Sequence, residues 1–496
     1  MENITLCLCF FMIFCIIVST WKIYNRRLQL PPGPTPLPLV GNIFQGSYVL
    51  YKSYNKLCKR YGPVFTVWLG NSPVVVLCGY QVVKEALIHY SHQFSARGPL
   101  PISERLAQGY GIITTNSNRW EQMRRFALTT LRNFGMGKRS MEHRVQEEAQ
   151  YLVKAIEDTC GETFNPKVVL ARAVNNVINL VVFGRRWDYE EKMLLTLLNT
   201  ITNLLNFIRS PLGVAYASFE GIMKYLPGPH QKIFEDCERL KCFIKEQMNS
   251  HRNTLNPDSP RDFIDCFLIQ ANKEKGRNNN EFCEENLAVS VFELFAAGTE
   301  TTANTLQFSL LVMIKYPHIQ DKIQKEIHTV IGPDRLPGIS DRIHMPYTNA
   351  VIHEIMRYLD LTPMALPHLV TEDTHFRGYT IPKGTTVIPL LSSVLSDPDH
   401  WKTPYDFNPE HFLDENGMFC TQEALMPFSA GKRICPGEGL ARMEIFLFVT
   451  ALLHKFTLKP ANNSDTFNLE ILRRAFRNNG LDYNLRAYPR AHNDQG

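Results

Sequence analysis

The sequence predicts a mainly helical fold with a minor β-sheet region. Hydrophobic residues make up 44% and charged residues 20% of the 496-residue chain, which is typical of a globular protein with a sizeable core. Several long segments carry apolar residues at helical spacing, and two short zones have the composition of strands. Because no Gly/Ser-rich linker or repeat divides residues 43–496, we expect one large domain there.

The elements are expected in the following order. Paired strands are predicted at 64–68 and 73–78, with a turn at 70–72. Helices are predicted at 146–158, 193–208, 233–251 and 286–314. A second strand zone is predicted at 374–379 and 385–389. An apolar helix is predicted from about 437 to 454.

The N-terminus predicts a transmembrane signal-anchor helix over residues 3–21. This segment has no charged side chain, and its helical length of about 28 Å is enough to cross the hydrocarbon of a bilayer. Glu2 precedes it, whereas Lys22, Arg26 and Arg27 follow it, which places the remaining chain in the cytosol. A cleaved signal peptide is the alternative, but these charges disfavour it. Residues 22–42 form a basic stop and a stiff proline-rich hinge.

The net charge and the cysteine content indicate which kind of partner and which cellular compartment to expect. The net charge of +5 is too small over this length to argue for a nucleic-acid partner. The twelve cysteines are scattered and form no C-x-x-C pair, so a disulfide scaffold is not expected. A reducing, cytosol-facing compartment is the simplest interpretation.

Residues 427–441 carry the clearest chemical signal. A glycine-bearing loop leads to Cys435, and Pro436 suits the first position of the helix that follows. Free N–H groups and the helix dipole at such a place favour thiolate over thiol, and a thiolate is a good soft ligand for iron. A buried structural cysteine is the alternative, although it would not need a Gly-Lys-Arg approach or a Pro-Gly departure.

These residues resemble a known family. Phe428-x-x-Gly431-x-Arg433-x-Cys435-x-Gly437 is similar to the haem-ligand signature of the cytochrome P-450 (haem-thiolate monooxygenase) superfamily. Three further motifs occur in the expected order, namely Trp120-x-x-x-Arg124, Ala297-Gly298-Thr299-Glu300-Thr301-Thr302 and Glu354-x-x-Arg357. The resemblance covers nearly the whole chain and looks closest to the animal microsomal family 2. It implies the cytochrome P-450 fold, with haem between the long oxygen-activating helix and the cysteine loop.

The resemblance also implies a cofactor and a catalytic pair. The cofactor would be haem b (iron protoporphyrin IX), with Cys435 as the axial ligand of the iron. Thr301 would bond to the carbonyl of Ala297 while Gly298 loosens the same turn, which would open a groove for dioxygen. Glu300 would supply protons. The expected donors to the haem propionates are Arg97, Trp120, Arg124, His368 and Arg433.

A third expectation is structural. Glu354 and Arg357 lie three residues apart on a predicted helix, so they share a face and can pair. The resemblance implies that this pair is buried and tied to the cysteine loop. The family usually completes it with an arginine in a P-E-R-F-like stretch. Here His411 takes that place, so we expect an intact structural role with a weaker hydrogen-bond fork.

The substrate is less well specified. The resemblance places the pocket along several segments, and the predicted lining is Ile113, Phe295, Ala297, Met364, Leu366, Phe476 and Arg477. This mostly apolar set favours a small lipophilic substrate such as a fatty acid, a steroid or a xenobiotic. Arg477 lies in a polar C-terminal turn, and we hypothesise that it meets a carboxylate or another polar end of the substrate. A side chain that simply faces water is the alternative.

The sequence has neither a G-x-G-x-x-G motif after a strand nor a P-loop, so a flavin or NADPH site is not expected in this chain. The electrons for the reaction are therefore expected from a separate reductase. The resemblance implies NADPH-cytochrome P-450 reductase in the endoplasmic reticulum membrane, with cytochrome b5 as a second donor. The basic residues that could dock them are Arg125, Arg132, Lys138, Arg139 and Lys432. Two other functions stay open, an isomerase or dehydratase of lipid peroxides and a non-enzymatic membrane-bound haem protein. The Glu300-Thr301 pair favours the monooxygenase.

Overall fold

The computed structural model describes residues 2–27, 29–42, 50–133, 139–277, 280–462, 469–478 and 482–490. The chain divides into two compact units, each assembled from separate segments. Unit 1 comprises residues 1–100, 362–405 and 423–435, and unit 2 comprises residues 101–361, 406–422 and 436–496. The secondary structure is mainly helical with small sheets, as the sequence predicted.

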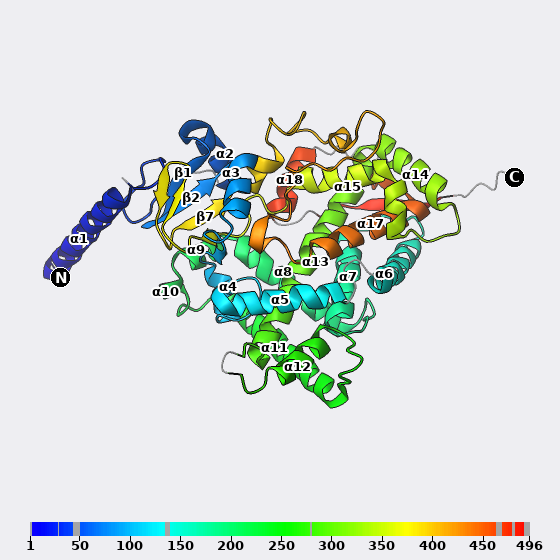
Figure 1. Cartoon of the computed structure of the whole chain (residues 1–496), viewed down its shortest axis with the longest axis horizontal. Helices are drawn as coiled ribbons and strands as arrows, with labels where there is room; N and C mark the ends of the chain where they lie inside the picture. Colours follow the sequence, from blue (N-terminus) through cyan, green and yellow to red (C-terminus); the bar gives the residue numbers. More distant parts are fainter. Residues whose placement is uncertain are drawn as a thin grey trace. The chain divides into compact units, whose positions relative to one another are not determined.

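Unit 1 is built around one five-stranded sheet. Its elements are α1 (Glu2–Arg27), α2 (Leu50–Tyr61), β1 (Val64–Leu69), β2 (Ser72–Leu77), α3 (Tyr80–Lys84), η2 (Glu85–His89), β3 (Ala96–Arg97), β4 (His368–Leu369), β5 (Thr374–Phe376), β6 (Tyr379–Ile381), β7 (Thr386–Pro389), α16 (Leu391–Leu395) and η5 (Gly431–Arg433). The strand order is β1-β2-β7-β4-β3, and only the β2–β7 pair is parallel. Strands β1, β2 and β7 lie side by side in Figure 1.

The sheet forms where the sequence predicted paired strands. In β1 and β2, β-branched and aromatic residues face a core shared with α2, in which Tyr54, Phe65 and Val76 are buried. The turn between the strands is Gly70-Asn71, and Gly70 has a φ of +59° that favours glycine. At the other end of the sheet, Arg97 of β3 lies directly opposite His368 of β4. The register of this short pair therefore places two predicted site residues side by side.

The second strand zone differs from the prediction. The segment expected to be one strand over 374–379 breaks at Arg377 and Gly378, whose φ values are +49° and +83°. Positive φ at two successive residues reverses the chain, so β5 and β6 form a separate two-stranded hairpin. β7 instead joins the large sheet, parallel to β2.

Helix α1 covers the predicted anchor. It ends with Arg26 and Arg27 in its last turn, and Ser19 bonds to the β1–β2 turn through the Asn71 side chain at 2.6 Å. The Leu39 N–H in the hinge donates to the same Ser19 hydroxyl at 3.0 Å. Among the residues that the structure describes, no helix combines the length and the apolar character needed to cross a membrane.

Unit 2 is predominantly helical. Its elements are α4 (Pro101–Ala107), α5 (Ser117–Asn133), α6 (Arg139–Glu157), α7 (Pro166–Val182), α8 (Lys192–Arg209), α9 (Pro211–Ser218), α10 (Glu220–Met223), α11 (Pro229–Thr254), α12 (Phe263–Lys273), α13 (Glu284–Lys315), α14 (Pro317–Ile331), η3 (Ile339–His344), α15 (Pro346–Leu359), η4 (Pro409–Phe412), α17 (Glu438–Lys455), β8 (Phe456–Pro460), α18 (Leu469–Asn478) and β9 (Leu485–Pro489). β8 and β9 form an antiparallel pair. The helices predicted at 146–158, 193–208, 233–251 and 286–314 are confirmed as α6, α8, α11 and α13.

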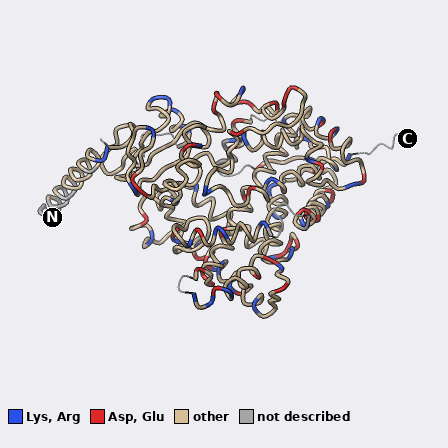
Figure 2. The backbone as a smooth tube through the Cα atoms, in the orientation of Figure 1, with Lys and Arg blue, Asp and Glu red and all other residues tan. Residues whose placement is uncertain are grey.

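Helix α13 is the central element of unit 2. It is apolar around most of its circumference, as a helix buried on all sides must be, and it contacts α7, α8, α11, α15 and α17 (Figure 1). Lys/Arg and Asp/Glu are interspersed along the chain (Figure 2). Buried charge is compensated locally, as where Arg186 donates to the fully buried Glu148 at 2.7 Å.

Candidate functional site

The cysteine loop is held by short-range bonds within unit 1. The Cys435 N–H donates to the carbonyl of Phe428 at 3.0 Å, and the Ile434 N–H donates to the carbonyl of Gly431 at 3.1 Å. Gly431 has a φ of +72°, and a Cβ there would overlap the carbonyl oxygen of Leu87 in η2. Only glycine therefore lets η5 pack against η2. The loop presents the Cys435 side chain on an exposed surface of the described protein.

One detail of the predicted loop is wrong. Pro436 is not the first helical residue, because α17 begins at Glu438 with Gly437 as its N-cap. Pro436 and Gly437 instead form a turn that separates Cys435 from the helix by two residues. A proline signals a helix start only when the next residues adopt helical angles, and here Gly437 does not.

Three predicted donors gather at one edge of the unit 1 sheet. Nη1 of Arg97 lies 3.3 Å from Nε2 of His368, and the opposite ring nitrogen, Nδ1, lies 2.6 Å from the carbonyl of Phe94. Arg433 is buried and donates through Nε to the carbonyl of Ser95 at 2.7 Å. Arg97 thus contacts His368 directly, and Arg433 is held beside the strand of Arg97 through Ser95.

The charge at this edge is positive. Burial and the nearby charge of Arg97, together with that of Arg433, lower the pKa of His368 to about 3. The ring is therefore neutral at physiological pH, with its proton on Nδ1 facing the carbonyl of Phe94 and with Nε2 accepting from Arg97. In this arrangement His368 positions Arg97, and the two arginines supply the positive charge.

The centre of α13 is open on one side. Between Asn286 and Ile314, only Ala297 and Thr301 are exposed, and nearly all other positions are buried. These two residues lie four apart and so share one face of the helix. The Thr301 hydroxyl donates to the Ala297 carbonyl at 2.7 Å, as the sequence predicted. A small residue and a hydroxyl thus border an open space in the middle of a buried helix.

The opposite side of the same helical turn is buttressed by α7. The sequence assigned Gly298 a loosening role, but α13 is continuous there, and a Cβ on Gly298 would come within 2.7 Å of Ile178. The glycine therefore allows α7 to approach. Beside it, the Asn175 side chain donates to the Thr299 hydroxyl at 2.9 Å, and Asn179 donates to Asn175 at 3.1 Å.

The catalytic acid predicted from the sequence is held by ion pairing. Nη1 of Arg209, the last residue of α8, donates to Oε1 of Glu300 at 2.6 Å. The Asn304 side chain donates to the same oxygen at 3.3 Å. Oε2 of Glu300 is buried and has no hydrogen-bond partner among the described residues. Arg209 was not among the residues selected from the sequence.

A second acid on α13 was also missed. Glu293 is buried, and its Oε2 accepts from the N–H groups of Ile112 at 2.5 Å and Ile113 at 2.9 Å. Gly111 has a φ of +94°, and a Cβ there would overlap the Glu293 carboxyl group. Glu293 therefore fixes the loop that carries the predicted pocket residue Ile113. In the sequence, the only sign of this role was that Glu293 is an acidic residue within an apolar segment.

Glu293 should make stability depend on pH. Burial raises the pKa of Glu293 to about 7, although its backbone hydrogen bonds oppose the rise. Between about pH 5 and pH 7 the native protein then keeps a proton that the unfolded chain releases, so this group lowers stability as the pH rises through that window. We expect Glu293→Gln to flatten the pH profile of the melting temperature, whereas Glu246→Gln, at an exposed site on α11, should leave the profile unchanged. Identical profiles for all three proteins would contradict this assignment.

The predicted structural pair is present and buried in unit 2. Arg357 donates to Glu354 through Nε at 2.7 Å and Nη2 at 2.6 Å, and their side chains are 1% and 0% exposed. Nδ1 of His411 lies 3.2 Å from Glu354, and the Asn408 N–H donates to Glu354 at 2.8 Å. Arg357 also donates to the carbonyl of Asp406 at 2.7 Å. The network ties α15 to the segment that contains η4.

Other predicted site residues lie as follows. On α5, Trp120 is buried, and the Arg124 guanidinium lies 5.8 Å from the centre of its ring. Phe295 is fully buried, with its ring 5.5 Å from that of Phe183. Met364 is half-buried against the core around Tyr54, and Leu366 is exposed.

The two C-terminal residues of the predicted pocket, Phe476 and Arg477, are described only in their backbone. The backbone of Phe476 and Arg477 belongs to α18, so the predicted turn is helical at these positions. Their side chains lie outside the described residues. The predicted contact of Arg477 with a polar substrate end therefore stays a prediction.

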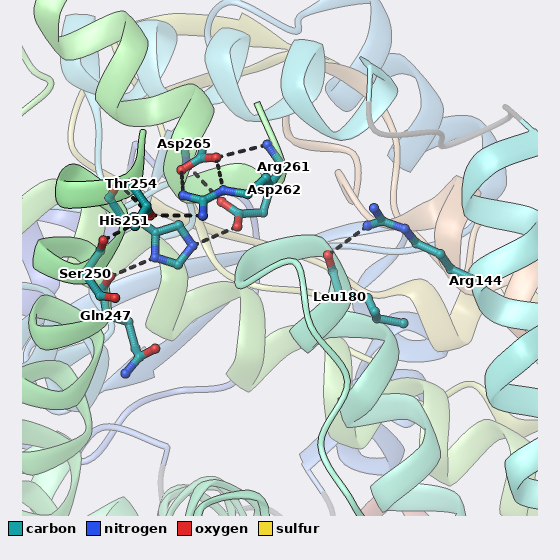
Figure 3. A network of polar contacts seen from close by, with 9 residues as sticks. All are labelled: Arg144, Leu180, Gln247, Ser250, His251, Thr254, Arg261, Asp262 and Asp265. Atoms are coloured by element: carbon teal, nitrogen blue, oxygen red, sulfur yellow. Dashed lines mark hydrogen bonds and ion pairs between the residues drawn. The ribbon is translucent and has the colours of Figure 1, made fainter. Parts of the chain in front are cut away.

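A separate polar network joins α11 to α12 (Figure 3). Nε2 of His251 lies 2.8 Å from Asp262, and Nδ1 lies 2.8 Å from the Gln247 carbonyl. Arg261 donates to both oxygens of Asp265 at 2.6 and 2.8 Å. The His251, Asp262 and Asp265 ligand atoms lie within 4.8 Å of one another, as in a metal site, but Arg261 already neutralises Asp265. The cluster is thus compensated by protein charge.

This network should be sensitive to pH. Both ring nitrogens of His251 face oxygen acceptors, which favours the doubly protonated ring. Burial opposes that charge, but the hydrogen bond to Asp262 and the negative charges of Asp262 and Asp265 raise the pKa of His251. The stabilisation that protonated His251 gives the folded protein is complete below the pKa of this residue in the unfolded chain. It is lost as the pH rises through the higher pKa of His251 in the folded protein. His251→Ala should therefore lower the melting temperature more at pH 6 than at pH 9, unlike His143→Ala at an exposed site. A loss that is equal at both pH values would refute the charged state.

Comparisons with known proteins show the family of this chain. The cytochrome P450 family profile matches residues 31–476. Similar proteins include cytochrome P450 2G1 of Oryctolagus cuniculus, 49% identical, 2C20 of Macaca fascicularis, 50% identical, and 2C8 of Homo sapiens, 48% identical. The alignments cover 92%, 94% and 94% of this chain and the same shares of the three relatives. The chain therefore belongs to the cytochrome P450 family of haem-thiolate monooxygenases.

Proposed function

We propose that this cytochrome P450 uses Cys435 as the thiolate ligand of its haem and inserts one atom of dioxygen into a lipophilic substrate. The observation that carries the proposal is the single open stretch of α13. Between Asn286 and Ile314 of α13, Ala297 and Thr301 are the exposed residues, and nearly all other positions are buried. An enzyme that binds a flat cofactor against this helix needs such a surface, whereas a purely structural helix does not.

The residues present fit a haem group. Its two propionates need donors, and Arg97 and Arg433 lie together at a positively charged edge beside neutral His368. Trp120 and Arg124 on α5 are the further donors. The Cys435 side chain is accessible at the end of its loop, so its sulfur could bind the iron as the axial ligand. When bound, the haem supplies the activation of dioxygen.

The side chains on α13 would handle protons and water. The Thr301 hydroxyl, which donates to the Ala297 carbonyl, can also accept a hydrogen bond from a bound water molecule. Glu300 lies next to it, with one oxygen held by Arg209 and the other without a partner among the described residues. A carboxyl group on the same helical turn as a hydroxyl can exchange protons with it through bound water. Thr301 and Glu300 are therefore the proposed catalytic pair.

The predicted pocket supports a lipophilic substrate such as a fatty acid, a steroid or a xenobiotic. Ala297 borders the open stretch of α13, and Ile113 lies in the loop that Glu293 fixes. Both side chains are apolar, and apolar lining with few polar groups is typical of sites for lipophilic ligands. Phe295, Met364, Leu366, Phe476 and Arg477 complete the proposed lining.

The proposed electron donor is NADPH-cytochrome P-450 reductase, with cytochrome b5 as a second donor. Arg125 and Arg132 are exposed and lie seven residues apart on α5, so they share one face. Lys432 is exposed in η5, whereas Lys138 lies outside the described residues. Basic residues on one face suit an acidic redox partner.

The proposed location is the endoplasmic reticulum membrane, with residues 3–21 as a single-pass anchor and the catalytic part in the cytosol. The support comes from exposed apolar side chains. On α1 they include Phe10, Ile13, Phe14 and Ile17. A second exposed apolar group lies in and around α9 and α10, at Val214, Phe219, Ile222, Tyr225 and Leu226. Apolar groups of this kind are typical of surfaces that meet lipid.

The proposal can be tested with purified full-length holoprotein, reductase and NADPH in ¹⁸O₂. A screen of lipophilic compounds should find products that carry one labelled oxygen atom and that require both NADPH and reductase. Thr301→Ala should reduce product formation while NADPH oxidation continues. Rearrangement of lipid hydroperoxides without reductase, and without uptake of label, would instead support an isomerase.

A further inference from the structure

The Arg209–Glu300 ion pair closes one end of α8 against the open stretch of α13. α8 ends at Arg209 because Ser210 leaves the helical conformation and caps α9, whose first residue is Pro211. The Arg209 side chain is 27% exposed and that of Glu300 is 18% exposed. The pair is thus partly open to solvent, one residue from Thr301. It lies at the rim of the open stretch rather than in the protein core.

The bonding of this pair is incomplete on both sides. Arg209 uses Nη1 for Glu300, and within the described residues its Nε and Nη2 donors make no hydrogen bond. A guanidinium has five N–H donors in a fork that matches carboxylates. Glu300 has one oxygen with two donors and one buried oxygen with no partner among the described residues. Arg209 therefore has the capacity to bind another carboxylate.

Exchange of one carboxylate for another leaves the charge of Arg209 paired throughout. The displaced Glu300 carboxylate loses this cation, and its 18% exposed side chain would be solvated by water. Glu300 would keep its bond from Asn304, which lies one helical turn away. Once released from Arg209, Glu300 could turn toward Thr301. A ligand carboxylate bound to Arg209 would thus release Glu300 for the proposed proton transfer beside Thr301.

We propose that Arg209 is a carboxylate-binding residue of the substrate site, and that an amphiphile with a carboxylate head replaces Glu300 on it. This inference rests on the proposed function for the location of the substrate, but not for the binding chemistry. It assigns the substrate class as long-chain carboxylates rather than neutral lipids of the same length. Arg209 then acts twice, by selecting the ligand and by releasing Glu300.

The test compares dodecanoate with dodecan-1-ol, which have equal chain length but different head groups. Binding to the full-length holoprotein is measured by calorimetry, which requires neither reductase nor turnover. Arg209→Met should weaken dodecanoate binding about 10- to 100-fold, the value of a charge-assisted hydrogen bond pair, and change dodecan-1-ol binding less than about twofold. Arg209→Lys should retain part of the preference. Lys192→Met, at an exposed position of the same helix, is the matched control.

A second variant tests the exchange itself. Glu300→Gln removes the competing carboxylate, so it should tighten dodecanoate binding several-fold in the native background and have no effect on it in the Arg209→Met background. Equal losses for both ligands in Arg209→Met, no loss for dodecanoate, or weaker dodecanoate binding in Glu300→Gln would overturn the proposal.

The two proposals can fail separately. Selective dodecanoate binding without labelled product in the reductase assay would refute the monooxygenase function and leave Arg209 as an anion site. Labelled products from neutral lipids, combined with no effect of Arg209→Met on dodecanoate binding, would support the monooxygenase function and refute the role of Arg209. Melting temperatures of each variant establish that the compared proteins are folded.

Discussion

Replacement of Cys435 by serine is expected to abolish the thiolate spectrum of the haem and nearly all monooxygenase activity. A serine hydroxyl fits the same loop, because the bonds that shape it run from backbone to backbone, through the N–H groups of Cys435 and Ile434. The change therefore removes the sulfur rather than the fold. Loss of partners around a metal ligand already costs about 10- to 100-fold in activity, so loss of the ligand itself should cost at least about 100-fold.

The measurement is the difference spectrum of the reduced protein with carbon monoxide, read beside product formation with reductase and NADPH. A thiolate ligand donates electron density to the iron, and its loss changes the Soret band of the carbon monoxide complex. Cys242→Ser is the matched control, because Cys242 is also exposed but lies on α11. An unchanged spectrum in Cys435→Ser would show that another residue binds the iron.

Local contacts were the part of the site that sequence could predict. The Thr301–Ala297 and Glu354–Arg357 bonds each join residues three or four apart on one helix, so helical periodicity alone brings them together. The paired strands β1 and β2 were predictable for a similar reason, because a short turn joins them. Such contacts depend on local geometry more than on how the helices pack.

Contacts between distant segments were not predictable from one sequence. Arg209 meets Glu300 across 91 positions, Asn175 meets Thr299 across 124, and Glu293 meets Ile112 across 181. Each depends on the packing of α8, α7 or a loop against α13. The same limit explains Gly298, whose purpose is visible only when Ile178 is placed beside it. Residues of ordinary type become functional candidates here through their neighbours.

Removal of Glu354 is expected to destabilise the protein strongly. In Glu354→Ala, Arg357 would keep its charge inside the protein without the Glu354 carboxylate, while still donating to the Asp406 carbonyl. The Asn408 N–H would lose the Glu354 oxygen as its acceptor. Breaking a buried ion pair by removing one partner costs about 3–5 kcal/mol, because the remaining charge is uncompensated. We expect a lower melting temperature and a lower yield of haem-loaded protein.

The reverse change and the double variant make the test specific. Arg357→Ala should cost a similar amount, because it leaves the Glu354 carboxylate buried with His411 and Asn408. The double variant should cost clearly less than the sum, since neither charge then remains unpaired. Lys154→Ala, which removes an exposed pair with Asp158, should leave the melting temperature unchanged. If the two single losses add fully, Glu354 and Arg357 act independently, and the pair does not stabilise the α15–η4 contact as a unit.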